Sequence, residues 1–116
     1  MKRRHSGIRL TLVSDTYDEV IGPVTYPVLI GRGADTDVSF PDKWTSRRHC
    51  EINQVGSQFV LRDLNSRHGT FVNGRATAET VLSCGDRISI GMNVLTVKLQ
   101  SERAVRLDLG ATSRSA

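Results

Sequence analysis

Residues 63–74 read Asp63-Leu64-Asn65-Ser66-Arg67-His68-Gly69-Thr70-Phe71-Val72-Asn73-Gly74. After Leu64 closes an apolar run, a polar loop offers amide, hydroxyl, guanidinium and imidazole groups at four consecutive positions. Gly69 permits a positive φ that a side chain would resist. Phe71-Val72 suits a short strand, and Asn73-Gly74 is the strongest short signal for a hairpin. A polar loop held between two strands typically presents its groups to something outside the fold.

Short stretches of alternating apolar and polar residues recur on both sides of this segment. They are separated by turns that contain glycine, at intervals of roughly 8–12 residues, and none shows an apolar stripe with helical period. This pattern predicts an all-β fold, either a sandwich or a barrel. Pro23 and Pro27 favour an edge position for the strand expected at Val24–Ile30. The clearest alternating stretches are Ile8–Val13, His49–Asn53, Gln58–Leu64, Ile88–Ile90 and Val94–Gln100.

The 116 residues are expected to form one domain, at residues 8–100, between a flexible basic N-terminus at 1–7 and a loose tail at 101–116. The chain has a formal net charge of +4, but residues 6–99 contain ten Lys or Arg and ten Asp or Glu. A folded body without net charge lacks the basic face that general binding to nucleic acid requires. We therefore expect no nucleic-acid partner.

The two cysteines predict neither a disulfide framework nor a metal site. Cys50 alternates with its neighbours as a buried strand residue does, and no cysteine or histidine spacing matches a metal site. No segment approaches the ~20 apolar residues of a membrane helix. We expect a monomeric cytoplasmic protein without metal, cofactor, membrane contact or small-molecule substrate.

Four arginines lie in the expected loops, at Arg32, Arg47, Arg48 and Arg67. Loops at one end of two packed sheets converge in space even when they are distant in sequence. If these loops meet, the sequence predicts a small anion site, since the arginine fork suits phosphate oxygens.

Three segments together resemble the forkhead-associated (FHA) domain: Gly31-Arg32, Ser46-Arg47-Arg48-His49 and residues 63–74. The resemblance extends from about Ile8 to Leu99. It implies an 11-stranded β-sandwich of two sheets whose loops at one end bind phosphothreonine peptides. The protein would then be a signalling adaptor for partners phosphorylated by Ser/Thr kinases.

Carried over by position, the resemblance divides the site residues into two groups. The phosphopeptide would be contacted by Arg32, Ser46, Arg47, Ser66, Arg67 and His68. Structural support of the site would come from Gly31, His49, Gly69, Thr70 and Asn73. His68 departs from the family, which commonly has Asn there to hydrogen-bond the ligand backbone.

Other interpretations remain beside this one. An enzyme is disfavoured because His49 and Cys50, as strand neighbours, point to opposite faces and no paired carboxylates share their loop. The alternatives are an FHA-fold scaffold that binds proteins without phosphate and, less favoured, a nucleic-acid-binding β-domain. Trp44 is expected either to pack at the end of the sandwich or to flank the peptide.

Overall fold

The computed structural model describes residues 8–15, 19–21 and 25–101. Within them, eleven β-strands form two sheets, which confirms the predicted all-β sandwich. The expected basic N-terminus at 1–7 and residues 102–116 of the expected tail lie outside this part of the chain. No helix in the described residues is long and apolar enough to cross a membrane.

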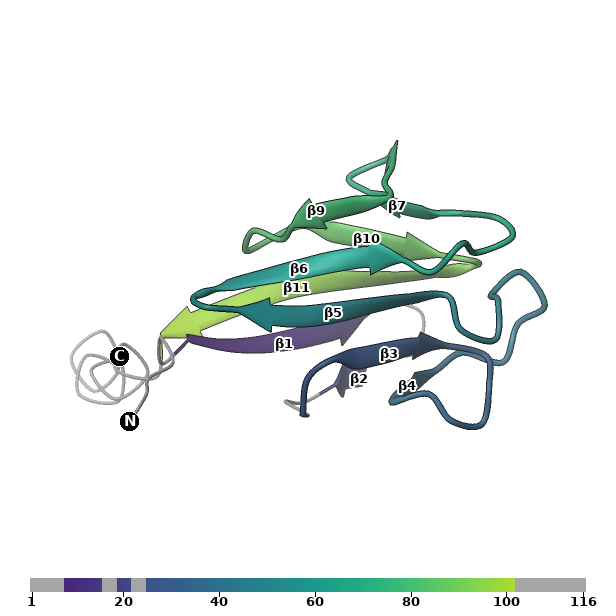
Figure 1. Cartoon of the computed structure of the whole chain (residues 1–116), viewed down its shortest axis with the longest axis horizontal. Coiled ribbons are helices and arrows are strands. Elements are labelled where there is room, and N and C mark those ends of the chain that lie inside the picture. The colour runs from purple at the N-terminus through teal and green to yellow at the C-terminus, as the bar shows by residue number, and fades with distance from the viewer. Residues whose placement is uncertain (1–7, 16–18, 22–24, 102–116) are drawn as a thin grey trace.

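The larger sheet has six strands in the order β2-β1-β11-β10-β7-β8. Its strands are β1 (Ile8–Ser14), β2 (Glu19–Ile21), β7 (Thr70–Val72), β8 (Arg75–Ala76), β10 (Arg87–Ile90) and β11 (Asn93–Ser101). The first and last of them, β1 and β11, are antiparallel neighbours from Ile8 opposite Ser101 to Ser14 opposite Leu95. The two ends of the described chain therefore lie together at one end of the sandwich (Figure 1).

The smaller sheet has five strands in the order β4-β3-β5-β6-β9. Its strands are β3 (Val28–Gly31), β4 (Val38–Ser39), β5 (Cys50–Val55), β6 (Gln58–Asp63) and β9 (Glu79–Val81). The expected edge position of β3 is wrong, because β3 pairs with β4 on one side and β5 on the other. Pro27 follows a cis Tyr26–Pro27 bond and lies just before the first residue of β3. Although proline has no N–H to donate, no hydrogen bond between the strands is lost at this position.

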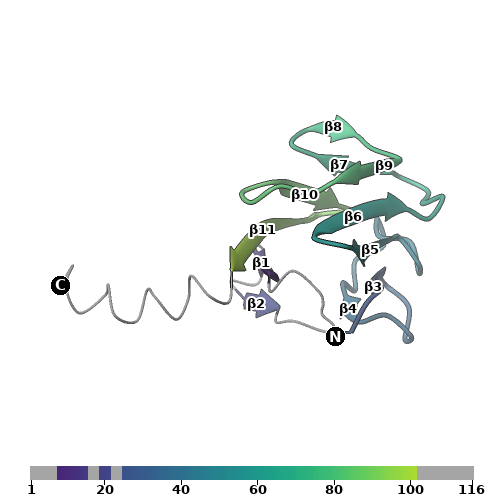
Figure 2. The same ribbon diagram turned by 60° about the vertical axis from the view of Figure 1, so that its left-hand side comes forward.

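The core lies between the two sheets, as the alternating pattern requires. Figure 2 shows β1, β2 and β11 on one side and β3, β5 and β6 on the other. Isoleucine, leucine, valine and phenylalanine from both sheets fill the space between them. Cys50 is fully buried among these side chains, and burial raises the pKa of its thiol to about 12. This confirms the prediction of a buried structural thiol.

Strand direction gathers several loops at one end of the sandwich. The chain leaves β3 and β6, and enters β5, at the right-hand end in Figure 1, away from Ile8 and Ser101. The turn between β10 and β11 lies at the same end. Loops 32–37, 40–49 and 64–69 are thus neighbours in space although they are spread over the sequence.

Asp42 holds the 40–49 loop against the turn between β10 and β11. Its carboxylate accepts hydrogen bonds from the Trp44 N–H at 2.9 Å, from Thr45 Oγ1 at 3.0 Å and from Asn93 Nδ2 at 2.6 Å. The fit is close, since a Cβ on Gly91 would lie 2.4 Å from Thr45 Oγ1. Partial burial raises the pKa of the Asp42 carboxyl, but the hydrogen bonds, from Asn93 and Thr45 above all, outweigh this effect and the net pKa is lowered.

We expect Asp42→Asn to reduce the free energy of unfolding near pH 7 by about 1–3 kcal/mol. A carboxyl whose folded-state pKa is lowered adds stability above its unfolded pKa of about 3.9, and this stability is lost as pH falls through the folded pKa. The variant should therefore lose less stability than the natural chain between about pH 5 and pH 2. Urea denaturation across this range measures both effects.

The matched control is Asp35→Asn, which removes a carboxylate that is exposed and paired with Arg48. This control should keep the acid dependence of the natural chain. The contribution assigned to Asp42 is contradicted if the acid dependence of Asp42→Asn is also unchanged.

Candidate functional site

Three loops meet at the end of the sandwich, two of them through their backbones and the third through the Ser46 hydroxyl. The Arg32 N–H donates to the Ser46 carbonyl at 2.9 Å, and the Gly33 N–H donates to the Arg47 carbonyl at 3.0 Å. From the third loop, the Arg67 N–H donates to Ser46 Oγ at 2.9 Å. The chain positions that carry three of the predicted arginines are therefore brought to one place.

Gly31 makes this approach of the loops possible. A Cβ at this position would lie 2.1 Å from the Arg47 carbonyl oxygen and 2.9 Å from the Ser46 carbonyl oxygen. Both atoms belong to backbone and cannot rotate away, so a side chain here would push the 40–49 loop outward. The absence of a side chain at Gly31 is thus what lets Arg32 and Ser46 lie side by side.

Ser46 is fixed at each of its backbone polar groups and at its hydroxyl oxygen. Its N–H donates to His49 Nδ1 at 3.0 Å, its carbonyl accepts from Arg32, and its Oγ accepts from the Arg67 N–H. A serine hydroxyl has one hydrogen to donate. Among the described residues no acceptor takes that hydrogen, so Ser46 can offer it to an acceptor outside the fold.

His49 is buried and connects two of the loops. Because Nδ1 accepts from the Ser46 N–H, it carries no hydrogen, and Nε2 must donate to the Gly69 carbonyl at 2.8 Å. The ring is therefore neutral, with its hydrogen on Nε2. Both nitrogens are occupied, so the side chain positions Ser46 and Gly69 and has no free nitrogen to act as a base.

The arginines differ in how their charge is used. The Arg48 guanidinium pairs with Asp35 at 2.9 Å, whereas Arg32 uses Nε to hold the Thr45 carbonyl at 3.0 Å. In the part of the chain that the structure describes, no carboxylate pairs with the exposed side chains of Arg32, Arg47 or Arg67. Three arginines without a carboxylate partner in this part of the chain thus occupy backbone positions next to Ser46.

The 64–69 loop is organised from within by Asp63. Its carboxylate accepts from the Ser66 N–H at 3.0 Å, from Ser66 Oγ at 2.5 Å and from Thr70 Oγ1 at 2.6 Å. Partial burial raises the pKa of Asp63, but these hydrogen bonds outweigh it and lower the net pKa. Ser66 Oγ also accepts from the Gly69 N–H at 3.0 Å. The Ser66 hydroxyl is therefore used inside the loop, and its predicted contact with a ligand stays a prediction.

His68 lies on the exposed surface of the same loop, against Trp44. The two ring centroids are 5.2 Å apart and the planes meet at 70°, an edge-to-face contact. Trp44 remains 43% exposed. The contact therefore joins the outer parts of the 40–49 and 64–69 loops.

Asn73 is the predicted site residue that these contacts do not bring into the cluster. Its Nδ2 donates to Asp86 at 2.9 Å and its Oδ1 accepts from the Arg87 N–H at 3.0 Å. It fixes the turn between β7 and β8, at the end of β7 that is farther from Gly69.

Sequence reasoning missed the two aspartates that hold these loops. In each case a Ser or Thr hydroxyl three residues later donates to the carboxylate: Thr45 to Asp42, and Ser66 to Asp63. Asp-x-x-Ser/Thr in a loop is a local signal for such a turn and could have identified both. The partner Asn93, 51 residues from Asp42, has no local signal.

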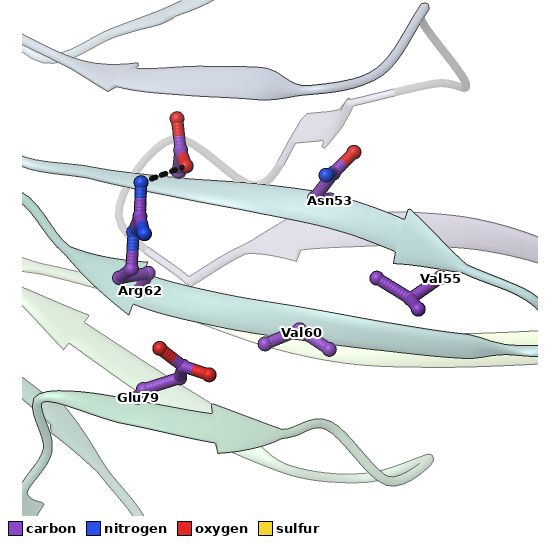
Figure 3. Close-up of a pocket in the computed structure, with 6 residues that line it drawn as sticks. Asn53, Val55, Val60, Arg62 and Glu79 are labelled. Atoms are coloured by element: carbon purple, nitrogen blue, oxygen red, sulfur yellow. Dashed lines mark hydrogen bonds and ion pairs between the residues drawn. The ribbon is translucent and has the colours of Figure 1, made fainter.

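A separate hollow of about 210 Å³ lies on the outer face of β5, β6 and β9 (Figure 3). There Arg62 pairs with Glu51 at 3.2 Å, beside Val60 and Glu79. None of the residues that line this hollow belongs to the three loops, so the hollow is distinct from the loop cluster. The described residues contain no group of three His, Cys, Asp or Glu that could hold a metal ion.

Comparison with known proteins agrees with this geometry. FhaA of Mycobacterium tuberculosis, an FHA domain-containing protein, is 42% identical over 71 residues, which cover 61% of this chain and 14% of FhaA. The oxoglutarate dehydrogenase inhibitor of Corynebacterium jeikeium is 43% identical over 61 residues, 53% of this chain and 42% of the inhibitor. This chain thus spans less than half the length of either relative.

A structure solved in a study of phosphothreonine-dependent FHA domain interactions superimposes with a TM-score of 0.73 at 36% identity. The match covers 78% of this chain and 95% of that one. The sequence profile of the FHA domain matches residues 28–91, which contain all three loops and most of the core strands. The chain therefore belongs to the FHA domain family.

Proposed function

We propose that residues 8–100 bind phosphothreonine-containing segments of partner proteins at the cluster of Arg32, Ser46, Arg47 and Arg67. The observation that carries this proposal is the state of Ser46. Its hydroxyl oxygen is held by the Arg67 N–H with the hydroxyl hydrogen unused, and the backbone positions next to it carry three arginines without a carboxylate partner among the described residues. This arrangement suits a small, highly charged group with several acceptor oxygens.

A phosphate monoester has the matching chemistry. It carries about −1.5 to −2 charges and three strong acceptor oxygens at neutral pH. The terminal nitrogens of Arg32 and the Ser46 hydroxyl can donate to it; Arg47 follows Ser46 in the chain, and the Arg67 backbone N–H contacts Ser46 Oγ. Hydrogen bonds to such a charged group contribute roughly 1.5–3 kcal/mol each. Three or four, less the cost of ordering the ligand, give an affinity near micromolar, which suits a reversible adaptor.

The comparisons support phosphothreonine as the ligand class, since a structural neighbour comes from work on phosphothreonine-dependent interactions. We place the protein in the cytoplasm, where kinases have ATP to phosphorylate its partners. The two free cysteines, Cys50 and Cys84, are compatible with a reducing compartment.

We infer a binding role and no catalytic one. His49 is the histidine nearest to the Ser46 hydroxyl in the loop contacts, and both of its ring nitrogens are occupied. It cannot take a proton from Ser46 as a general base without breaking the loop. The relative from C. jeikeium is named as an inhibitor, which is compatible with regulation through binding.

Arg32→Ala should weaken binding of a phosphothreonine peptide by at least about tenfold, or 1.4 kcal/mol. The reason is that its exposed guanidinium has no carboxylate partner among the described residues, so a bound phosphate would be its main counterion. Calorimetric titration gives the affinity, and a thermal melt shows whether the variant stays folded.

Arg48→Ala is the matched control, because it removes one positive charge from the neighbouring 40–49 loop, but a charge that Asp35 already pairs. It should weaken binding much less. Equal losses in the two variants would mean that general charge, and no specific contact, attracts the peptide.

Phosphothreonine should bind about fourfold more tightly than phosphoserine in otherwise identical peptides. The family resemblance implies a small pocket for the threonine methyl beside residues 66–68, and burying one such group contributes about 0.8 kcal/mol. Parallel titrations measure the ratio. Equal affinities would argue against the pocket.

A further inference from the structure

The hollow on the outer face of β5, β6 and β9 is an open apolar surface (Figure 3). Val60 on β6 lies opposite Asn53 on one side and Val81 on the other, and Val55 lies near the far end of β5. Val55 is 56% exposed and Val81 is 47% exposed, so both keep surface that a partner could bury. At about 210 Å³ the hollow is smaller than the about 300–1,000 Å³ typical of small-molecule sites. It suits apolar side chains of a polypeptide better than a whole small molecule.

One negative charge beside these valines has no partner. Glu51 lies opposite Arg62, and Arg62 lies opposite Glu79, so the three form a row across the sheet. The Arg62 guanidinium bonds to Glu51 at 3.2 Å, and Figure 3 shows it turned toward Glu51 and away from Glu79. In the described part of the chain, no cation pairs with the Glu79 carboxylate. The hollow therefore favours a ligand that has a positive group next to apolar ones.

The hollow adjoins the loop cluster along β6. Asp63 ends β6 and holds the 64–69 loop, and Val60 lies three residues before it, about 10 Å along the strand. From Asp63 to Arg67, whose N–H contacts Ser46 Oγ, is four residues, or at most about 15 Å. The hollow thus lies within about 25 Å of the proposed phosphate position. About eight extended residues of a ligand can cross that distance.

We propose that this hollow docks a second segment of the phosphorylated partner, one in which apolar residues flank a Lys or Arg. The inference rests on the proposed function and adds a second contact to it, on a surface outside the three loops. Two segments of one polypeptide share a high effective concentration, so a weak second contact raises the overall affinity. A second copy of this chain is disfavoured as the occupant, because it would bring a second unpaired Glu79 carboxylate to the interface.

The test uses the full chain and an alanine-based phosphothreonine peptide joined to a short docking sequence. A Gly/Ser linker of about sixteen residues has a root-mean-square length of roughly 22 Å, which suits the span. The docking sequence is Val-Lys-Val, Val-Glu-Val or Ser-Gly-Ser, placed before or after the phosphothreonine. On at least one side, Val-Lys-Val should tighten binding about fivefold over Ser-Gly-Ser in calorimetric titration, and Val-Glu-Val should gain less. The unpaired arginines of the loops repel lysine, so they cannot produce this gain.

Variants assign the gain to the hollow. Glu79→Lys should reduce the gain of Val-Lys-Val to less than about twofold and should transfer it to Val-Glu-Val. Val81→Ser should reduce the gain of both sequences. The matched control is Lys98→Glu, which reverses an exposed charge on β11 of the larger sheet and should change neither gain. The phosphothreonine peptide without a docking sequence should bind every variant equally, and thermal melts establish that each variant is folded.

The outcomes separate this inference from the function on which it rests. Equal affinity for the three docking sequences, or a gain that survives in both Glu79→Lys and Val81→Ser, overturns the docking surface and leaves phosphothreonine binding standing. Dimerisation of the chain that Val81→Ser abolishes assigns the hollow to a second copy and also overturns the proposal. Failure of every phosphorylated peptide to bind more tightly than its unphosphorylated form overturns the proposed function and the docking surface together.

Discussion

The close contact between two loop backbones determines the arrangement of the whole binding end. The N–H groups of Arg32 and Gly33 reach the carbonyls of Ser46 and Arg47 just beyond the end of β3. This approach leaves no room for a Cβ at Gly31, which would lie 2.1 Å from a backbone oxygen. Arg32 and Ser46 are neighbours as a consequence, and the Arg67 N–H joins them through its own bond to Ser46 Oγ.

The positive charge of the site comes from the arrangement of the charged side chains more than from the amino-acid composition of the chain. Residues 6–99 have no formal net charge, yet their acids and bases are used differently at this end of the sandwich. Asp42 and Asp63 are partly buried, which raises the pKa of each carboxyl, but the hydrogen bonds that they accept, from Asn93 and Thr45 and from Ser66 and Thr70 respectively, keep it lowered. Arg32, Arg47 and Arg67 remain on the surface. The acids thus stabilise the loops, and the unpaired bases create a local positive potential.

Much of this could be predicted from the sequence, where local patterns determine the result. Alternation identified the strands of the core, and Asn73-Gly74 does form the turn between β7 and β8. The edge position expected for β3 was wrong. Pro27 lies before the first paired residue of β3, and the sequence does not indicate that the two-residue strand β4 pairs with the free side of β3. The bond from Asn93 to Asp42 joins residues 51 positions apart and depends on a tertiary contact, which no local pattern encodes.

The pairing of Ile8 with Ser101 has a consequence for how a ligand could be delivered. Both ends of the folded body leave it opposite the binding loops, separated from them by the length of β11. Nine residues at about 3.3 Å each make that distance roughly 30 Å. A phosphothreonine on the same polypeptide would need a linker of roughly ten extended residues to run back along the sandwich. A phosphothreonine on a separate molecule meets no such requirement, so linker length would decide between self-recognition and recruitment.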